Sequence, residues 1–220
     1  MYKLCVFDLD GTLVNTIADI AFAVNRALEE LELPVHEEDA YRLMVGNGMQ
    51  MLCLRALPED RRDDEELLSD LVRRYNDYYC AHCCDRSRAY PGIPDMLRRL
   101  NGAGIRCAVI SNKPHPQTRI VLETLFDTDD FFYAEGQSER FAKKPDAEAL
   151  LDCIAQAGVS KDETIYVGDS NVDAAFAKNA GVNCIGATWG FRGRKELEEA
   201  GVTYLAETAE DICRIVLKQD

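Results

Sequence analysis

Short apolar runs alternate with helix-like segments along most of this chain. The apolar runs predict buried strands at residues 4–7, 106–110, 131–134, 164–167 and 183–187. Between and after them, apolar residues recur at helical spacing, which predicts helices at residues 93–103, 117–125, 146–157, 172–179, 194–199 and from 210 onward. Strands and helices that alternate in this way are typical of a mostly parallel sheet with helices on both faces. The expected fold class is therefore α/β.

One part of the chain lacks this alternation. After the first predicted strand, only helical spacing is found, at residues 15–33, 37–45, 49–57 and 65–84. A stretch rich in Pro and Gly at residues 89–94 then leads back to the alternating pattern. We therefore expect an α/β core formed by residues 1–15 and 89–220, with residues 16–88 inserted as a smaller helical domain.

The composition is acidic, with 39 Asp and Glu against 25 Lys and Arg and a formal net charge of -14. Such a chain repels nucleic acid and anionic membrane surfaces, so neither is an expected partner. No apolar run approaches the length of a membrane span, and the amino terminus lacks a signal-like segment, which favours a cytoplasmic protein. Both a monomer and a homodimer remain open.

The nine cysteines form no recognisable disulfide framework. An odd number spread over core-like positions is typical of reduced thiols that serve as small apolar residues. Cys80, Cys83 and Cys84 share one face of a predicted helix. This favours a buried stripe over a zinc site, because no second cysteine pair lies at the required spacing.

The first candidate for chemistry follows the predicted strand at residues 4–7. Asp8 and Asp10 come directly after this strand, followed by Gly11 and Thr12. The two carboxylates therefore lie at the carboxyl end of a strand, where open α/β sheets bind their ligands. Two negative charges this close need a cation or a shared proton, so the motif indicates a metal site.

Further polar residues follow two other predicted strands. Ser111 and Asn112 come after the strand at residues 106–110, where a hydroxyl and a backbone N–H could bind one phosphate group. Asp169 follows the strand at residues 164–167, and Asp173 lies four residues later on the first turn of a helix. Residues at this spacing share a helix face, so both carboxylates can face the site opened by Asp8.

Lys143 and Lys144 precede a predicted helix start. A positive charge is unfavourable beside the positive end of a helix dipole, so a nearby anion explains the pair better than helix stability does. The alternative is a solvated basic turn.

These motifs, in this order, resemble the four motifs of the haloacid dehalogenase superfamily, and the resemblance covers essentially the whole chain. It implies that Asp8 is the nucleophile, that Asp10 is the general acid/base, and that Ser111 binds phosphate. The superfamily places its lysine directly before a proline, which selects Lys144 over Lys143. Its role would be to neutralise charge on Asp8 and on the transferring phosphoryl group.

The resemblance also implies Mg²⁺ as the cofactor. Asp8, Asp169 and the backbone carbonyl of Asp10 would hold the ion, and Asp173 would support its shell directly or through water. Dehalogenases of the superfamily lack the acid/base that Asp10 supplies. The expected reaction is therefore hydrolysis of a small phosphorylated metabolite through an aspartyl phosphate.

The helical insertion resembles the small cap that closes over the site in this superfamily. Residues 45–49 and the segment around Arg55 resemble the cap of phosphoglycolate phosphatases, which makes 2-phosphoglycolate the expected substrate and Arg55 a candidate for binding its carboxylate. Thr12, Asn15 and Asn112 are further expected substrate contacts. The alternatives are a phosphomutase similar to β-phosphoglucomutase, a pyrophosphatase or nucleotidase, and a non-catalytic sensor of phosphorylated ligands.

Overall fold

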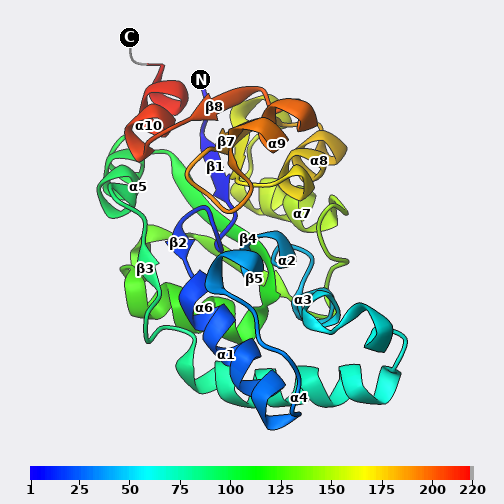
Figure 1. The fold of residues 1–220 in the computed structure, drawn as a ribbon. Helices are drawn as coiled ribbons and strands as arrows, with labels where there is room; N and C mark the ends of the chain where they lie inside the picture. The colour runs from blue at the N-terminus through cyan, green and yellow to red at the C-terminus, as the bar shows by residue number, and fades with distance from the viewer. Residues whose placement is uncertain (219–220) are drawn as a thin grey trace.

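The computed structural model describes residues 1–218 and contains a six-stranded parallel sheet with the order β5-β4-β1-β6-β7-β8 (Figure 1). The strands are β1 (Leu4–Phe7), β4 (Arg106–Pro114), β5 (Tyr133–Gln137), β6 (Thr164–Gly168), β7 (Asn183–Ala187) and β8 (Tyr204–Ala206). The predicted α/β class is confirmed. Strand β8 was not predicted, because it is a short edge strand with one buried residue and so leaves no apolar run in the sequence.

Strand β1 lies in the middle of the sheet. All of its side chains are buried, and both of its edges are paired in parallel, with Cys5 opposite Cys107 of β4 and Ile165 of β6. Parallel strands end at the same edge of a sheet, so the residues that follow β1 and β6 come together there with the end of β4.

Strand β4 is longer than predicted. It continues past residue 110 to Pro114, which pairs with Gln137 of β5 after a register shift. Ser111, Asn112 and Lys113 therefore belong to the sheet and are buried. This rigid backbone holds their side chains at the carboxyl edge.

Helices cover both faces of the sheet (Figure 1). Cys5 and Phe7 face a core shared with α5 and α10, whereas Leu4 and Val6 face a core shared with α7 and α8. Full burial of a large apolar side chain contributes about 1.5–3 kcal/mol, so these two cores hold β1 firmly in place. The helices of this part are α5 (Ile93–Gly102), α6 (His115–Leu125), α7 (Glu148–Ala157), α8 (Asn171–Ala180), α9 (Gly193–Ala200) and α10 (Ala209–Leu217).

A helical segment lies between two short antiparallel strands, β2 (Val14–Asn15) and β3 (Arg88–Ala89). In Figure 1 it occupies the lower part of the molecule, beyond the carboxyl edge of the sheet. That residues 16–88 form a separate domain remains a prediction. The α-helices of the segment are α1 (Ile17–Glu30), α2 (Tyr41–Met44), α3 (Met49–Ala56) and α4 (Glu65–His82). Short 3-10 turns occur in the chain at Glu38–Ala40, Glu59–Arg61, Thr128–Asp130 and Lys161–Glu163.

The prediction of a buried cysteine stripe is wrong for Cys80, which is exposed. Helix α4 buries Leu71, Tyr75 and Tyr79 at a spacing of four residues, and Cys80 lies just outside this stripe. Because α4 ends at His82, the half-buried Cys84 lies beyond the helix. All nine cysteines are free.

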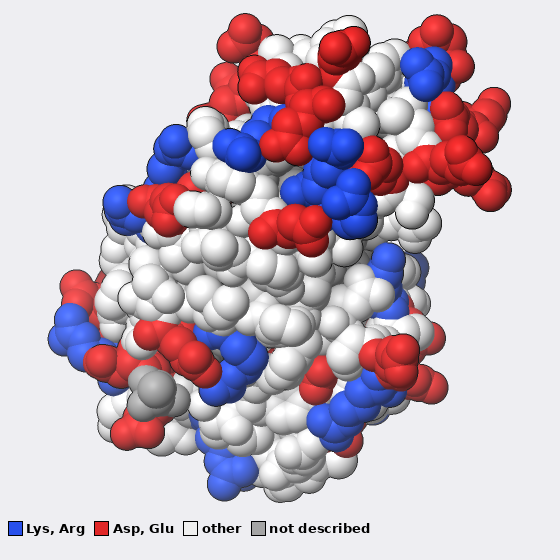
Figure 2. Space-filling model, turned by 90° about the horizontal axis from the view of Figure 1, so that it is seen from below, with Lys and Arg blue, Asp and Glu red and all other residues white. Residues whose placement is uncertain are grey.

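Acidic and basic side chains are mixed on the surface. On the face shown in Figure 2, groups of Lys and Arg lie beside Asp and Glu. Oppositely charged side chains on the surface form ion pairs, such as Arg74 with Glu30 and Asp70. Within residues 1–218, no helix is both long and apolar enough to cross a membrane.

Candidate active site

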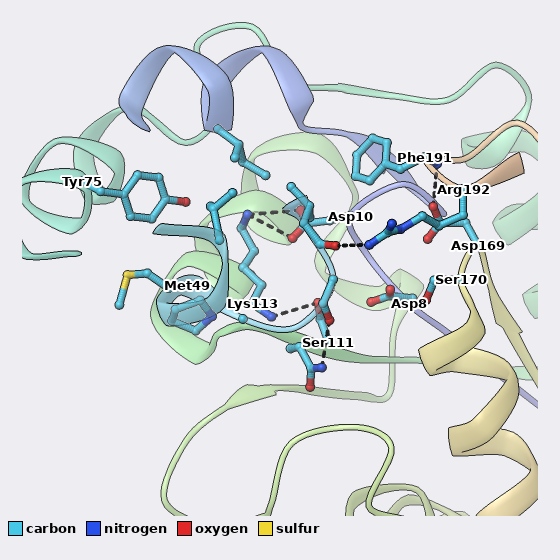
Figure 3. A pocket seen from close by; sticks show the side chains of 17 residues that line it. Asp8, Asp10, Met49, Tyr75, Ser111, Lys113, Asp169, Ser170, Phe191 and Arg192 are labelled. Carbon is cyan, nitrogen blue, oxygen red and sulfur yellow. Dashed lines mark hydrogen bonds and ion pairs between the residues drawn. The ribbon is translucent and has the colours of Figure 1, made fainter. Parts of the chain in front are cut away.

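The carboxyl edge of the sheet and the helical segment enclose a cavity of about 50 Å³ (Figure 3). The sheet side of its wall is polar and includes Asp8, Asp10, Ser111, Lys113 and Asp169. The helical segment supplies a mostly apolar wall that includes Ile20, Val45, Met49, Leu52 and Tyr75. We refer to the polar wall as the charged floor and to the apolar wall, which the helical segment supplies, as the cover.

Asp8 is buried at the centre of the charged floor. Its Oδ1 lies 2.9 Å from Nζ of Lys144 and accepts a hydrogen bond from the backbone N–H of Leu9 at 2.7 Å. Burial raises the pKa of Asp8 to about 7 against the opposing effect of Lys144, and Asp173 contributes in the same direction as burial. Further positive charge beside Asp8 would therefore favour its ionised form.

Lys144 is the lysine of the predicted pair that reaches the site. Its Nζ donates to Oδ1 of Asp173 at 2.7 Å and to the Tyr166 hydroxyl at 3.0 Å, in addition to its contact with Asp8. Burial alone would lower the pKa of Lys144, but the carboxylates of Asp173 and Asp8 raise it above its ordinary value. Lys144 is therefore a permanent cation in the site, whereas Lys143 is half-buried and forms no ion pair within residues 1–218.

Asp169 lies beside Asp8 and is held by the loop after β7. Its Oδ2 accepts a hydrogen bond from the backbone N–H of Phe191 at 2.6 Å. Gly11, which has a φ of +85°, and Gly190 both pack against this carboxylate so closely that a Cβ at either position would clash with it. Burial, followed by the nearby carboxylates of Asp173 and Asp8, raises the pKa of Asp169 well above its ordinary value.

Asp173 contacts Lys144 rather than open space. Its Oδ1 accepts hydrogen bonds from Lys144 and from the Tyr166 hydroxyl, and its Oδ2 accepts from the backbone N–H and the hydroxyl of Ser170. These bonds occupy both oxygens. The side chain is therefore well suited to orient Lys144.

The carboxylates fit a hard divalent cation. One oxygen each from Asp8, Asp169 and Asp173 lie within 4.8 Å of one another, and all three residues are buried. Mg²⁺ prefers oxygen ligands of this kind and is usually held by one or two carboxylates, with water and substrate phosphate completing the shell. Asp8 and Asp169 are the two whose oxygens are less fully occupied by hydrogen bonds.

Asp10 pairs with a lysine that the sequence analysis did not identify. Nζ of Lys113 lies 3.1 Å from Oδ1 of Asp10 and donates to the Tyr79 hydroxyl of α4 at 2.6 Å. Burial opposes the charged form of Lys113, but Asp10 raises its pKa above the ordinary value. A signal was present in the sequence, because Lys113 directly follows Ser111 and Asn112 at a strand end.

The side chain of Asn112 is occupied by the backbone. Its Oδ1 accepts from the N–H of Lys144 at 2.9 Å, and its Nδ2 donates to the carbonyls of Gly46 at 3.0 Å and Lys144 at 3.2 Å. Asn112 therefore ties the Lys144 loop to the helical segment. Ser111 lines the cavity, and its hydroxyl accepts from the N–H of Lys113 at 3.2 Å.

Three expected substrate contacts do not line this cavity. The Thr12 hydroxyl is buried and lies 3.5 Å from Asp169, and Asn15 accepts a hydrogen bond from the backbone N–H of Ile17 at the start of α1. Arg55 donates to the carbonyl of Met44 at 2.8 Å and to Oδ1 of Asn47. The Arg55 side chain takes this direction because the carbonyl at the end of α2 has no partner within the helix and attracts the guanidinium.

A different arginine, Arg192, lines the cavity. It precedes α9, and its Nη2 donates to the carbonyl of Val45 at 2.8 Å. Its position in the loop that follows a parallel strand is the sequence signal that could have identified it.

Comparisons with known proteins agree with this geometry. A family model described as haloacid dehalogenase-like hydrolase matches residues 5–187. A phosphoglycolate phosphatase from Pseudomonas putida is 39% identical over 192 residues, which cover 86% of this chain and 70% of that protein. A phosphoglycolate phosphatase from Mannheimia succiniciproducens is 33% identical over 220 residues, which cover 98% of each chain.

Solved structures show the same fold. The crystal structure of a predicted phosphoglycolate phosphatase from Haemophilus somnus has a TM-score of 0.90 to this chain at 29% identity and covers 97% of each chain. The resemblance inferred from the four motifs is thereby confirmed. The chain belongs to the haloacid dehalogenase-like hydrolases, as one of their phosphatases.

Proposed function

We propose that this phosphatase hydrolyses 2-phosphoglycolate in a Mg²⁺-dependent reaction through an aspartyl phosphate on Asp8. The observation that carries the proposal is the buried Asp8 carboxylate, 2.9 Å from Nζ of Lys144, in the wall of a cavity that Asp10 and Asp169 also line. Nucleophile, cation and acid/base thus surround one small space.

Asp8 acts as the nucleophile. One of its carboxylate oxygens bonds to phosphorus while the bond from phosphorus to the ester oxygen breaks. Lys144 offsets the negative charge of Asp8 and of the phosphoryl group, and Ser111 binds a phosphoryl oxygen at the edge of the cavity. Asp173 contributes by orienting Lys144.

Asp10 moves the protons of the reaction. It gives a proton to the leaving ester oxygen, and it then takes a proton from the water that attacks the aspartyl phosphate. Inorganic phosphate leaves and the Asp8 carboxylate is restored.

The residues that would hold Mg²⁺ are Asp8, Asp169 and, through its backbone carbonyl, Asp10. When bound, the ion supplies positive charge opposite the phosphoryl oxygens. The raised pKa values of Asp8 and Asp169 support this assignment, because two adjacent buried carboxylates are both ionised only when a cation offsets their charge.

Cavity size supports a small substrate. A cavity of about 50 Å³ holds about three to five water molecules, so even a substrate as small as 2-phosphoglycolate requires some opening of the cover. A sugar or nucleoside would require the cover to open much further. The curated relatives named phosphoglycolate phosphatases support the same substrate.

Phosphate release with Mg²⁺ present tests the proposal across 2-phosphoglycolate, glucose 1-phosphate, a nucleoside monophosphate and pyrophosphate. We expect 2-phosphoglycolate to have the highest kcat/KM, chelation to abolish turnover, and added Mg²⁺ to restore it. Ca²⁺ should substitute poorly, because its larger and looser shell would misplace the phosphate relative to Asp8. Full activity in excess chelator, or a clear preference for a sugar phosphate or nucleotide, would contradict the proposal.

A further inference from the structure

Arg192 is fixed beside the reaction centre. The preceding residue, Phe191, donates its backbone N–H to Asp169 at 2.6 Å, so the loop that carries Arg192 is anchored to the charged floor. Figure 3 shows the Arg192 side chain directed from this loop into the cavity, where its guanidinium donates to the carbonyl of Val45. A ligand in this cavity therefore meets the guanidinium.

The charge of Arg192 is not neutralised by a carboxylate. Among residues 1–218, its hydrogen bond is to a neutral partner, the carbonyl of Val45, and it forms no ion pair. The other cations of the site are engaged, since Lys113 pairs with Asp10 and Lys144 pairs with Asp8. Arginine has several N–H donors in a planar fork, and most of those on Arg192 remain available.

A second uncompensated cation lies nearby. Arg55 is bonded to a carbonyl and a side-chain amide oxygen, and no carboxylate pairs with it among the described residues. Burial, and then the proximity of Arg192, lowers the pKa of Arg55. Two guanidinium groups that repel each other favour an anion in their neighbourhood. Arg192 is the one of the two that lines the cavity.

We infer that Arg192 is the specificity-determining residue of this phosphatase and that it binds a carboxylate attached close to the ester oxygen of the substrate. The inference rests on the proposed function, and it identifies the residue that binds the carboxylate of the substrate. With the phosphate at Asp8 and Lys144, a two-carbon leaving group would keep its carboxylate close to the phosphate, in the cavity that Arg192 also lines. A guanidinium can bind such a carboxylate through two parallel hydrogen bonds.

Lys113 is the obvious alternative partner, but its surroundings argue against that role. Its Nζ already lies within 3.1 Å and 3.3 Å of the two oxygens of Asp10 and donates to the Tyr79 hydroxyl. A substrate carboxylate would have to displace a buried ion pair there. Arg192 could bind the substrate carboxylate without breaking an ion pair.

A pair of matched substrates provides the test. Ethyl phosphate has the same two-carbon ester as 2-phosphoglycolate but carries a methyl group in place of the carboxylate, so it lacks the second anionic group. We expect the unmodified enzyme to prefer 2-phosphoglycolate by at least about 30-fold in kcat/KM. The substitution Arg192→Met should lower kcat/KM for 2-phosphoglycolate by about 30-fold to 1,000-fold, the usual effect of removing one partner of a desolvated charge pair, and should change ethyl phosphate by less than about threefold.

Two further variants keep the test decisive. Arg192→Lys retains a charge without the planar fork, so its loss on 2-phosphoglycolate should be smaller than that of Arg192→Met. Arg55→Met removes the neighbouring cation from outside the cavity, so its selective loss on 2-phosphoglycolate should be much smaller than that of Arg192→Met. If Arg192→Met does not fold, the preference of the unmodified enzyme and the Arg192→Lys result still decide the question.

The outcomes separate this inference from the proposed function. Equal losses for both substrates in Arg192→Met would mean that the residue acts on the cover through Val45, and that result overturns the inference. An unmodified enzyme that hydrolyses both esters equally well would overturn it too, while leaving a small-ester phosphatase intact. If neither ester is hydrolysed with Mg²⁺ present, the proposed function itself is wrong.

Discussion

Nζ of Lys113 donates to the Tyr79 hydroxyl at 2.6 Å, and this contact joins helix α4 to the carboxyl edge of the sheet. The same nitrogen lies 3.1 Å from Oδ1 of Asp10. Both Lys113 and Tyr79 are buried, so the bond is shielded from water. The orientation of Asp10 is therefore coupled to the position of α4 above the cavity.

Removing this hydroxyl should lower activity without unfolding the protein. In Tyr79→Phe, Lys113 loses a buried acceptor, and the loss of one hydrogen bond to a charged group corresponds to about a 10-fold to 100-fold decrease in kcat for 2-phosphoglycolate. Steady-state kinetics would measure it. Tyr78→Phe is the matched control, because Tyr78 lies on the same helix and its hydroxyl forms no hydrogen bond within residues 1–218. Equal effects of the two substitutions would contradict the coupling.

Asp8→Asn should abolish catalysis while preserving the shape of the site. The amide cannot attack phosphorus as the carboxylate does, so kcat should fall by at least about three orders of magnitude. Circular dichroism should show an unchanged fold. Phosphatase activity close to that of the unmodified enzyme would rule out Asp8 as the nucleophile.

Lys144→Met should destabilise the protein as well as inactivate it. The substitution leaves the buried carboxylates of Asp8 and Asp173 without their cation, and breaking a buried ion pair in this way costs about 3–5 kcal/mol. Urea unfolding at pH 8 would measure the loss. The control is Lys143→Met, which removes a half-buried lysine outside any described ion pair and should change stability by less than about 0.5 kcal/mol. Similar losses in both variants would argue against a special role for Lys144.

Stability should depend on pH through Asp8. Burial raises the pKa of Asp8 to about 7, whereas an unfolded Asp titrates near about 3.9, so the folded protein holds the extra proton between these values. The resulting contribution to stability is complete below about pH 4 and is lost as the pH rises through 7, by up to about 4 kcal/mol. Urea unfolding of the metal-free protein from pH 5 to 8 would measure this decrease.

Mg²⁺ should counteract the loss, because the proposed site would bind the ion through the ionised carboxylate. The stabilisation by Mg²⁺ should accordingly be larger at pH 8 than at pH 6, as judged by the shift in the unfolding midpoint. In Asp8→Asn both the pH dependence and the Mg²⁺ effect should shrink. An equal Mg²⁺ effect at the two pH values in the unmodified protein would place the ion elsewhere.

Local sequence patterns were sufficient for the fold class and for much of the candidate site. Apolar runs identified most of the parallel strands, and polar residues at the ends of three of them identified Asp8, Asp10, Ser111 and Asp169, which line one cavity. The physical reason is that parallel strands end at one edge of the sheet, so backbone topology alone brings these residues together. Short elements such as β2, β3 and β8 left no comparable pattern, because they contain too few residues to show a period.

The partners of the charged side chains were decided by tertiary structure. Tyr79 and Lys113 come from α4 and β4, and Arg192 reaches the cavity from the loop after β7, so their contacts depend on how distant segments pack. Arg55 is the converse case. Its cap segment suggested a substrate contact, but its side chain bonds to Met44 and Asn47 outside the cavity. A long side chain can reach several acceptors from one backbone position. The sequence by itself therefore determined which strand ends place carboxylates at one edge of the sheet, whereas only the packing of distant segments decided which cations face the cavity.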